Sequence, residues 1–104
     1  LVGGFATDVI NKVYSNYCIL GANGISDIGT TTSVYSETQV NEAMVNRCDG
    51  KVIIVADGSK VGKSHNFFSV PANKIDILVT DSTANADELK KTAEKGIEII
   101  TVRT

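Results

Sequence analysis

Two short polar segments of the chain hold the side chains best suited to binding a ligand. They are Gly21-Ala22-Asn23-Gly24 and Asp57-Gly58-Ser59-Lys60, and each directly follows an apolar run. The first segment offers an amide, and the second offers a carboxylate and an ammonium group. An ammonium binds an anionic substituent as a point charge, and a carboxylate accepts hydrogen bonds from hydroxyls. The sequence therefore predicts a site for a small polar ligand made by Gly21, Asn23, Gly24, Asp57 and Lys60.

The same residues also have a purely structural interpretation. Asn23 between two glycines can simply form a turn, because Asn and Gly tolerate positive φ. Asp57 and Lys60 can form a surface salt bridge, with Asp57 starting a helix. On the residues alone, both interpretations stay open.

Other candidate chemistry is weaker. The run from Gly58 to Ser64 resembles a phosphate-binding loop, but it has one residue fewer between its glycines than that motif requires and no long helix follows. A nucleoside triphosphatase is therefore not expected. Cys18 and Cys48 form no Cys-x-x-Cys pattern, and His65 is the only histidine, so we expect neither a metal site nor a cofactor.

The periodicity of apolar residues predicts the elements that position these segments. Ser36 and Asn85 are suited to cap the helices that follow them. The segments 26–35 and 61–74 are expected to be long connections that line a site or an interface. Helices are expected over residues 5–14, 36–47 and 86–95, and strands over residues 17–22, 51–57, 75–81 and 97–102.

The predicted strands are apolar at successive positions, which is typical of strands buried on both faces. We therefore expect an α/β fold of three layers, with a mainly parallel sheet of about four strands and flanking helices. In such a sheet, ligands bind outside the carboxyl ends of the strands, where both polar segments lie.

Size and charge limit the possible functions. The 104 residues suit one domain or part of one, with 42% apolar and 21% charged residues and a net charge of −2. A chain with this charge lacks the basic surface of a DNA-binding domain. No apolar run approaches the roughly 18 residues of a membrane span, and the few cysteines fit a cytoplasmic setting. Because the chain starts at Leu1 within an apolar stretch, we expect a fragment that begins inside a domain.

Five segments, in this order and spacing, resemble one family. They resemble the C-terminal effector-sensing domain of DeoR-type bacterial transcriptional repressors of sugar metabolism. The resemblance extends over nearly the whole chain, so residues 1–104 would be the C-terminal part of the sensing domain. The segments are 21–25 (GANGI), 37–44 (ETQVNEAM), 56–62 (ADGSKVG), 75–81 (IDILVTD) and 96–99 (GIEI).

The resemblance implies a fold like that of ribose-5-phosphate isomerase and glucosamine-6-phosphate deaminase. It also implies a phosphorylated sugar as effector, a DNA-binding helix-turn-helix domain outside this chain, and a cytoplasmic homo-oligomer. The Gly-Thr-Thr-like loop that cradles the effector phosphate in the family would precede Leu1. The pair Phe67-Phe68, beside Pro71, is expected to contribute to an interface or to cover the pocket.

The related isomerases also show why this chain is expected to be a sensor. Asp57 to Lys60 resembles their Asp-x-Ser-Lys stretch, whose lysine contributes to the sugar-phosphate site. Their first loop carries carboxylates, or Asp with His, to move protons, whereas this chain has Asn23, Gly24 and Ile25 there. An amide cannot accept a proton near neutral pH, so no catalytic residue is expected. Two alternatives remain: an isomerase or deaminase with Asp27 or Asp57 as base, and a purely structural oligomerisation domain.

Overall fold

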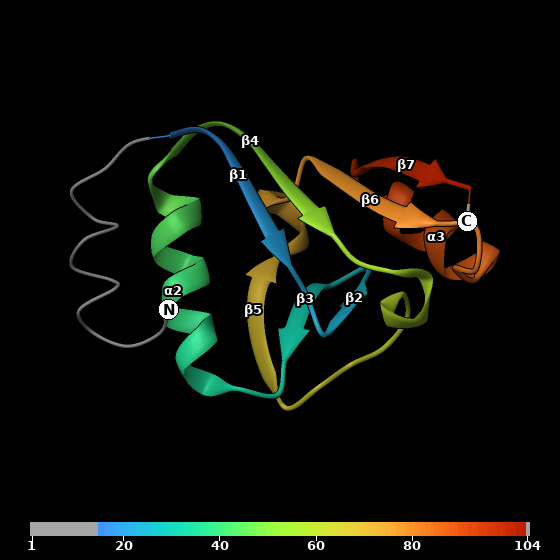
Figure 1. The fold of residues 1–104 in the computed structure, drawn as a ribbon, viewed down its shortest axis with the longest axis horizontal. Coiled ribbons are helices and arrows are strands. Elements are labelled where there is room, and N and C mark those ends of the chain that lie inside the picture. The colour runs from blue at the N-terminus through green and yellow to red at the C-terminus, as the bar shows by residue number, and fades with distance from the viewer. Residues whose placement is uncertain (1–14, 104) are drawn as a thin grey trace.

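A four-stranded parallel sheet runs through the computed structural model, which describes residues 15–103 (Figure 1). Neighbouring strands pair in parallel throughout this sheet. This confirms the predicted α/β class and the parallel sheet of about four strands, whereas the predicted helix at 5–14 lies outside the described residues. The strand order is β1 (Ser15–Gly21), β4 (Cys48–Val55), β6 (Ile77–Asp81) and β7 (Glu98–Val102).

A second, antiparallel sheet packs against the first. It contains β2 (Gly24–Ser26), β3 (Gly29–Thr32) and β5 (Phe67–Pro71), in that order. These strands occupy parts of the segments 26–35 and 61–74, where the sequence predicts long connections. These strands have three to five residues each, too few to establish an alternating pattern, although the β-branched threonines of β3 favour extended backbone. Two short 3-10 helices flank β5 in the sequence: η1 (Gly58–Lys60) precedes it and η2 (Ala72–Lys74) follows it.

The two α-helices within residues 15–103 lie at opposite ends of this part (Figure 1): α2 (Tyr35–Asn46) beside β5 and α3 (Ala86–Ala93) beside β7. Asn85 caps α3 as predicted, since its side chain accepts a hydrogen bond from the Glu88 N–H at 3.0 Å. The predicted cap at Ser36 was wrong. Val34 occupies the N-cap position of α2 and makes no side-chain cap bond, so the helix begins one residue earlier than expected.

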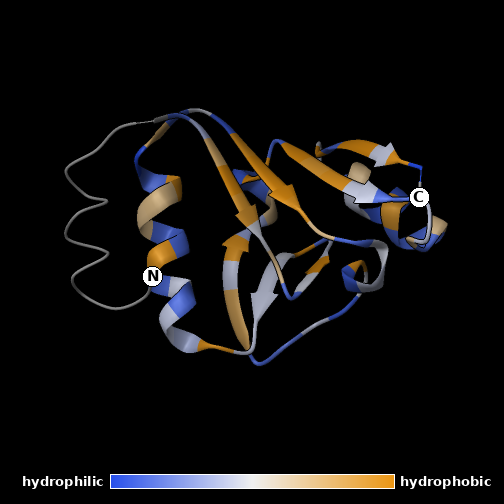
Figure 2. Ribbon diagram, in the orientation of Figure 1, coloured by the Kyte–Doolittle hydropathy of each residue, from blue (hydrophilic) through white to orange (hydrophobic). Residues whose placement is uncertain are grey.

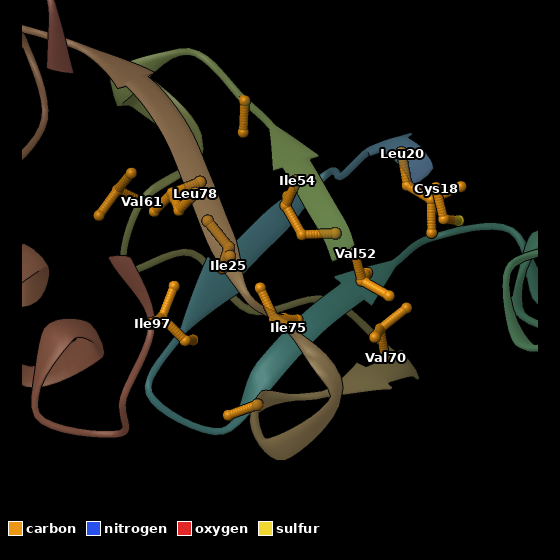
Figure 3. Packing of buried hydrophobic residues seen from close by; sticks show 12 residues of the cluster. Cys18, Leu20, Ile25, Val52, Ile54, Val61, Val70, Ile75, Leu78 and Ile97 are labelled. Atoms are coloured by element: carbon orange, nitrogen blue, oxygen red, sulfur yellow. The ribbon is translucent and has the colours of Figure 1, made fainter. Parts of the chain in front are cut away.

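The hydrophobic core lies between the two sheets (Figure 3). Ile54 and Leu78 from the parallel sheet and Ile25 from β2 have no exposed surface. Cys18 joins this core as a small apolar side chain, and burial raises the pKa of its thiol to about 11. Cys48 is only half-buried. Figure 2 shows apolar residues concentrated along β1, β4 and β6, the strands that carry much of this core.

Strand β1 and the end of β4 are buried on one face rather than on both, which differs from the sequence prediction. Along β1, Cys18 and Leu20 are buried, whereas Tyr17 and Ile19 are 64% and 62% exposed. Val55 of β4 is likewise 47% exposed. An apolar run shows that both faces of a strand are hydrophobic, but it does not show whether anything covers the second face.

Candidate ligand-binding site

A polar cavity of about 390 Å³ opens between α2 and the antiparallel sheet, where β1 ends. Side-chain hydroxyls, two amides and one carboxylate supply most of its polar groups, and Val40 supplies an apolar surface. The cavity is lined by Gly21, Ala22, Asn23, Thr30, Thr31, Thr32, Glu37, Val40, Asn41 and Ser69.

The three threonines of β3 form one wall of the cavity and are all buried. Their hydroxyl oxygens accept hydrogen bonds from backbone N–H groups. The donors are Val70 to Thr30 at 3.0 Å, His65 to Thr31 at 3.0 Å and Val34 to Thr32 at 3.2 Å. These bonds fix β3 against β5 and against the start of α2. The wall is therefore held rigidly by its own polar groups.

Thr32 also connects the loop after β1 with α2. Its hydroxyl oxygen lies 2.7 Å from Asn23 Oδ1 and 2.8 Å from Glu37 Oε2. The Ser33 N–H approaches the same Asn23 oxygen at 3.4 Å, which orients the amide with its oxygen toward Thr32. A hydroxyl has a single proton, so it can donate to only one of these two acceptors at a time.

A second contact joins α2 to the antiparallel sheet across the cavity. The Asn41 side-chain Nδ2 donates a hydrogen bond to Ser69 Oγ at 2.9 Å. Glu37, Val40 and Asn41 share one face of α2, because residues three and four positions apart are neighbours on a helix. Among the hydrogen bonds of residues 15–103, none engages the Asn41 Oδ1 atom.

The sequence-predicted site residues divide between this cavity and its surroundings. Gly21 and Asn23 line it. Gly24 is buried behind it, where an added Cβ would lie 2.9 Å from Thr31 Oγ1 and would also meet the backbone of Lys63. Gly24 thus permits a close approach of two backbone segments and does not itself face the cavity.

Asp57 and Lys60 do not line the cavity. Asp57 caps η1, accepting hydrogen bonds from the Ser59 N–H at 2.9 Å and from the Ser59 hydroxyl. The hydroxyl bond is the main reason that the pKa of Asp57 is lowered. Lys60 Nζ lies 3.9 Å from Asp57 Oδ2, and both side chains are well exposed. The contacts seen here are those of the structural interpretation, a surface salt bridge and a helix start.

The two predicted loops nevertheless lie next to each other. The Gly62 N–H donates to the Ile25 carbonyl at 2.7 Å, and His65 Nε2 lies 3.1 Å from the Asn23 carbonyl oxygen. The segment that follows Lys60 is therefore tied to the segment that follows Asn23. Among the hydrogen bonds and ion pairs of the described residues, none joins the side chains of Asn23 and Lys60.

Sequence reasoning missed the carboxylate in the cavity. Glu37 lines the cavity, whereas Asp27 and Asp57, the bases of the enzyme alternative, do not. Two features of the sequence could have indicated Glu37. Glu37 and Asn41 are four residues apart on a predicted helix and so share one face, and a row of threonines precedes that helix. Within residues 15–103, no group of three or more His, Cys, Asp or Glu side chains could hold a metal ion. No helix in this part of the chain is long and apolar enough to cross a membrane.

Comparisons with known proteins agree on one family. The family model described as the DeoR C terminal sensor domain matches residues 1–82. The HTH-type transcriptional regulator GlpR of Haloferax volcanii is 30% identical over 101 residues, covering 96% of this chain and 39% of that protein. The HTH-type transcriptional repressor GlcR of Bacillus subtilis is 26% identical over 100 residues, with 96% and 38% covered. The chain thus spans about two fifths of the length of these relatives.

Proposed function

Because this chain belongs to the DeoR C-terminal sensor-domain family, we propose that it binds a phosphorylated sugar and that binding controls a helix-turn-helix domain outside these 104 residues. The observation that carries the proposal is the polar cavity at the end of β1. Its volume of about 390 Å³ falls within the range of small-molecule sites. Hydroxyl, amide and carboxylate groups converge on it, as recognition of a sugar requires.

The proposed effector site combines the cavity with the neighbouring loop. Gly21 and Asn23 line one side, Gly24 lies buried behind them, and Asp57 and Lys60 lie on the adjoining loop. An exposed salt bridge contributes only about 0–1 kcal/mol, so Lys60 can exchange its partner for an anionic group at little cost. Asp57 would accept a hydrogen bond from a sugar hydroxyl.

The whole protein is proposed to be a cytoplasmic homo-oligomer that binds DNA through its other domain. The net charge of −2 makes specific duplex binding by this chain alone unexpected. The relatives are named as transcription regulators, which supports a regulator over an enzyme. The amide of Asn23, in place of a proton-accepting group, supports the same conclusion. The alternative is an isomerase or deaminase of the same fold that uses Asp27 or Asp57 as base.

The test measures DNA binding by the full-length protein in the presence of sugar phosphates. A gel shift with the protein's own upstream promoter is repeated with ribose 5-phosphate, glucosamine 6-phosphate, fructose 1-phosphate and tagatose 6-phosphate. At least one of them is expected to change the DNA affinity and to raise the unfolding midpoint. Lys60→Ala should weaken that effector about tenfold, the effect of losing one charge-assisted hydrogen bond. Lys63→Ala, which removes another exposed cation, is the matched control.

Two results would contradict the proposal in different ways. A panel that leaves both DNA affinity and thermal stability unchanged would favour a structural oligomerisation domain. Turnover of ribose 5-phosphate or glucosamine 6-phosphate that disappears in Asp57→Asn would establish the enzyme alternative. Equal effects of Lys60→Ala and Lys63→Ala would remove Lys60 from the site.

A further inference from the structure

The charge of the cavity indicates which part of an effector can enter it. Glu37 is its charged lining residue, and no Lys, Arg or His of the described chain lines it. Among residues 15–103, no cation forms a salt bridge with Glu37. A phosphate ester carries about two negative charges at neutral pH, and like charges at close range repel. The lining that residues 15–103 provide therefore disfavours the anionic end of a ligand.

The hydrogen-bonding groups of the cavity indicate what can enter instead. Asn23 Oδ1 and Glu37 Oε2 both lie within hydrogen-bonding distance of Thr32 Oγ1, which has one proton for the two of them. Asn41, another lining residue, donates its Nδ2 to Ser69 and adds an amide oxygen that can accept a hydrogen bond. Asn23 and Glu37 therefore compete for the one Thr32 proton, and the acceptor that does not receive it can take a hydrogen bond from elsewhere. A ligand hydroxyl next to these two groups would supply that proton.

We propose that this cavity binds the hydroxylated carbon chain of the effector, with Glu37 and Asn23 accepting hydrogen bonds from adjacent hydroxyls. The anionic substituent stays outside the cavity. Val40 lies between Glu37 and Asn41 on the α2 face and offers a surface for the C–H groups of the same chain. The inference rests on the proposed function, which it deepens by assigning to Glu37 the recognition of hydroxyls.

The decisive variant is Glu37→Gln in the full-length protein, because it removes the charge with little change of shape. Calorimetric titrations use the four sugar phosphates named above, the neutral polyols glucitol and galactitol, and inorganic phosphate. Affinity for a sugar phosphate and for a polyol is expected to fall about tenfold or more, the effect of losing a hydrogen bond to a charged acceptor. Affinity for inorganic phosphate is expected to stay unchanged.

Glu42→Gln provides the matched control, since it removes the same charge from an exposed position of α2 that does not line the cavity. It should leave all of these affinities unchanged. Glu37→Asp is a second variant that keeps the charge and withdraws the carboxylate by one methylene. It should also weaken the hydroxylated ligands, and it keeps the test available if Glu37→Gln does not fold.

The outcomes separate this inference from the proposed function. If sugar phosphates bind but neither Glu37 variant weakens them, the function stands and the inference is overturned. Tighter binding of inorganic phosphate by Glu37→Gln would also overturn it, since phosphate would then lie beside Glu37. If only polyols bind, and do so in a Glu37-dependent way, the inference stands and the sugar-phosphate proposal fails. If neither class binds, both are overturned.

Discussion

Gly58 is the residue at which the loop carrying Asp57 and Lys60 approaches the end of β6. Its N–H donates to the Asp81 carboxylate, which also accepts from the Thr83 N–H at 2.9 Å and from the Thr83 hydroxyl. These bonds lower the pKa of Asp81, with the Thr83 hydroxyl as the largest cause. The position leaves no room for a side chain, because an added Cβ would lie 2.6 Å from Asp81 Oδ1.

We therefore expect Gly58→Ala to lower the free energy of unfolding by about 1–3 kcal/mol, the usual cost of overpacking. Urea unfolding followed by circular dichroism measures the change. Gly21→Ala is the control, since its added Cβ would meet its nearest neighbour, the Val55 carbonyl oxygen, at 3.9 Å. If the two variants had the same free energy of unfolding, the loop around residue 58 would be able to accommodate a Cβ without loss of stability.

Single site residues could be predicted where they directly follow a strand that the sequence identifies. Gly21 and Asn23 could be placed at the cavity because they form the polar loop that follows the apolar strand β1. Glu37 could not be placed, because its position depends on how α2 turns relative to β3. Likewise, nothing in the sequence shows that the Lys60 ammonium lies beside Asp57 rather than beside Asn23.

At the level of elements, α3 offers the clearest test of a local signal. The Asn85 side chain accepts a hydrogen bond from the Glu88 N–H, and Asp87 and Glu88 lie in the first turn, where negative charge is favourable. Asn85→Ala should lower the free energy of unfolding by about 1 kcal/mol, as the loss of a cap typically does. Asn85→Asp should retain most of it. Thermal unfolding of both variants measures the difference, and no loss in Asn85→Ala would mean that packing alone holds the helix.

The elements themselves were predictable in proportion to their length and hydrophobicity. The four parallel strands and the two described helices were found within a few residues of their observed ends. The strands β2, β3 and β5 were missed because each is short and is held by partners distant in sequence. Residues Gly29 and Pro71 of β3 and β5, for example, pair although the whole of α2 and β4 separates them.

For the whole molecule, the exposed aromatic residues near α2 bear on assembly. Phe67 packs edge-to-face on Tyr35 with ring centroids 5.4 Å apart, whereas Phe68 is 50% exposed. If the proposed homo-oligomer uses this surface, Phe68→Ser should lower the mass of the full-length protein in light scattering. Phe67→Ser should instead lower its stability, since it removes the contact with Tyr35. Paired changes that leave mass and effector affinity unaltered would exclude both an interface and a pocket cover.

The hydrogen bond from the Val70 N–H to Thr30 joins residues forty positions apart in the chain. Closing so large a loop costs entropy before the contacts within it can form, so pairings of this kind form late in folding. The pairing of β6 with β7 closes a shorter stretch, and each halving of loop length lowers this cost by about 0.6 kcal/mol. The cavity wall therefore depends on contacts between residues that lie far apart in the chain. A ligand that bridges Asn23 and Asn41 would tie the loop after β1 to α2, so this half of the domain would gain stability with the logarithm of the ligand's concentration.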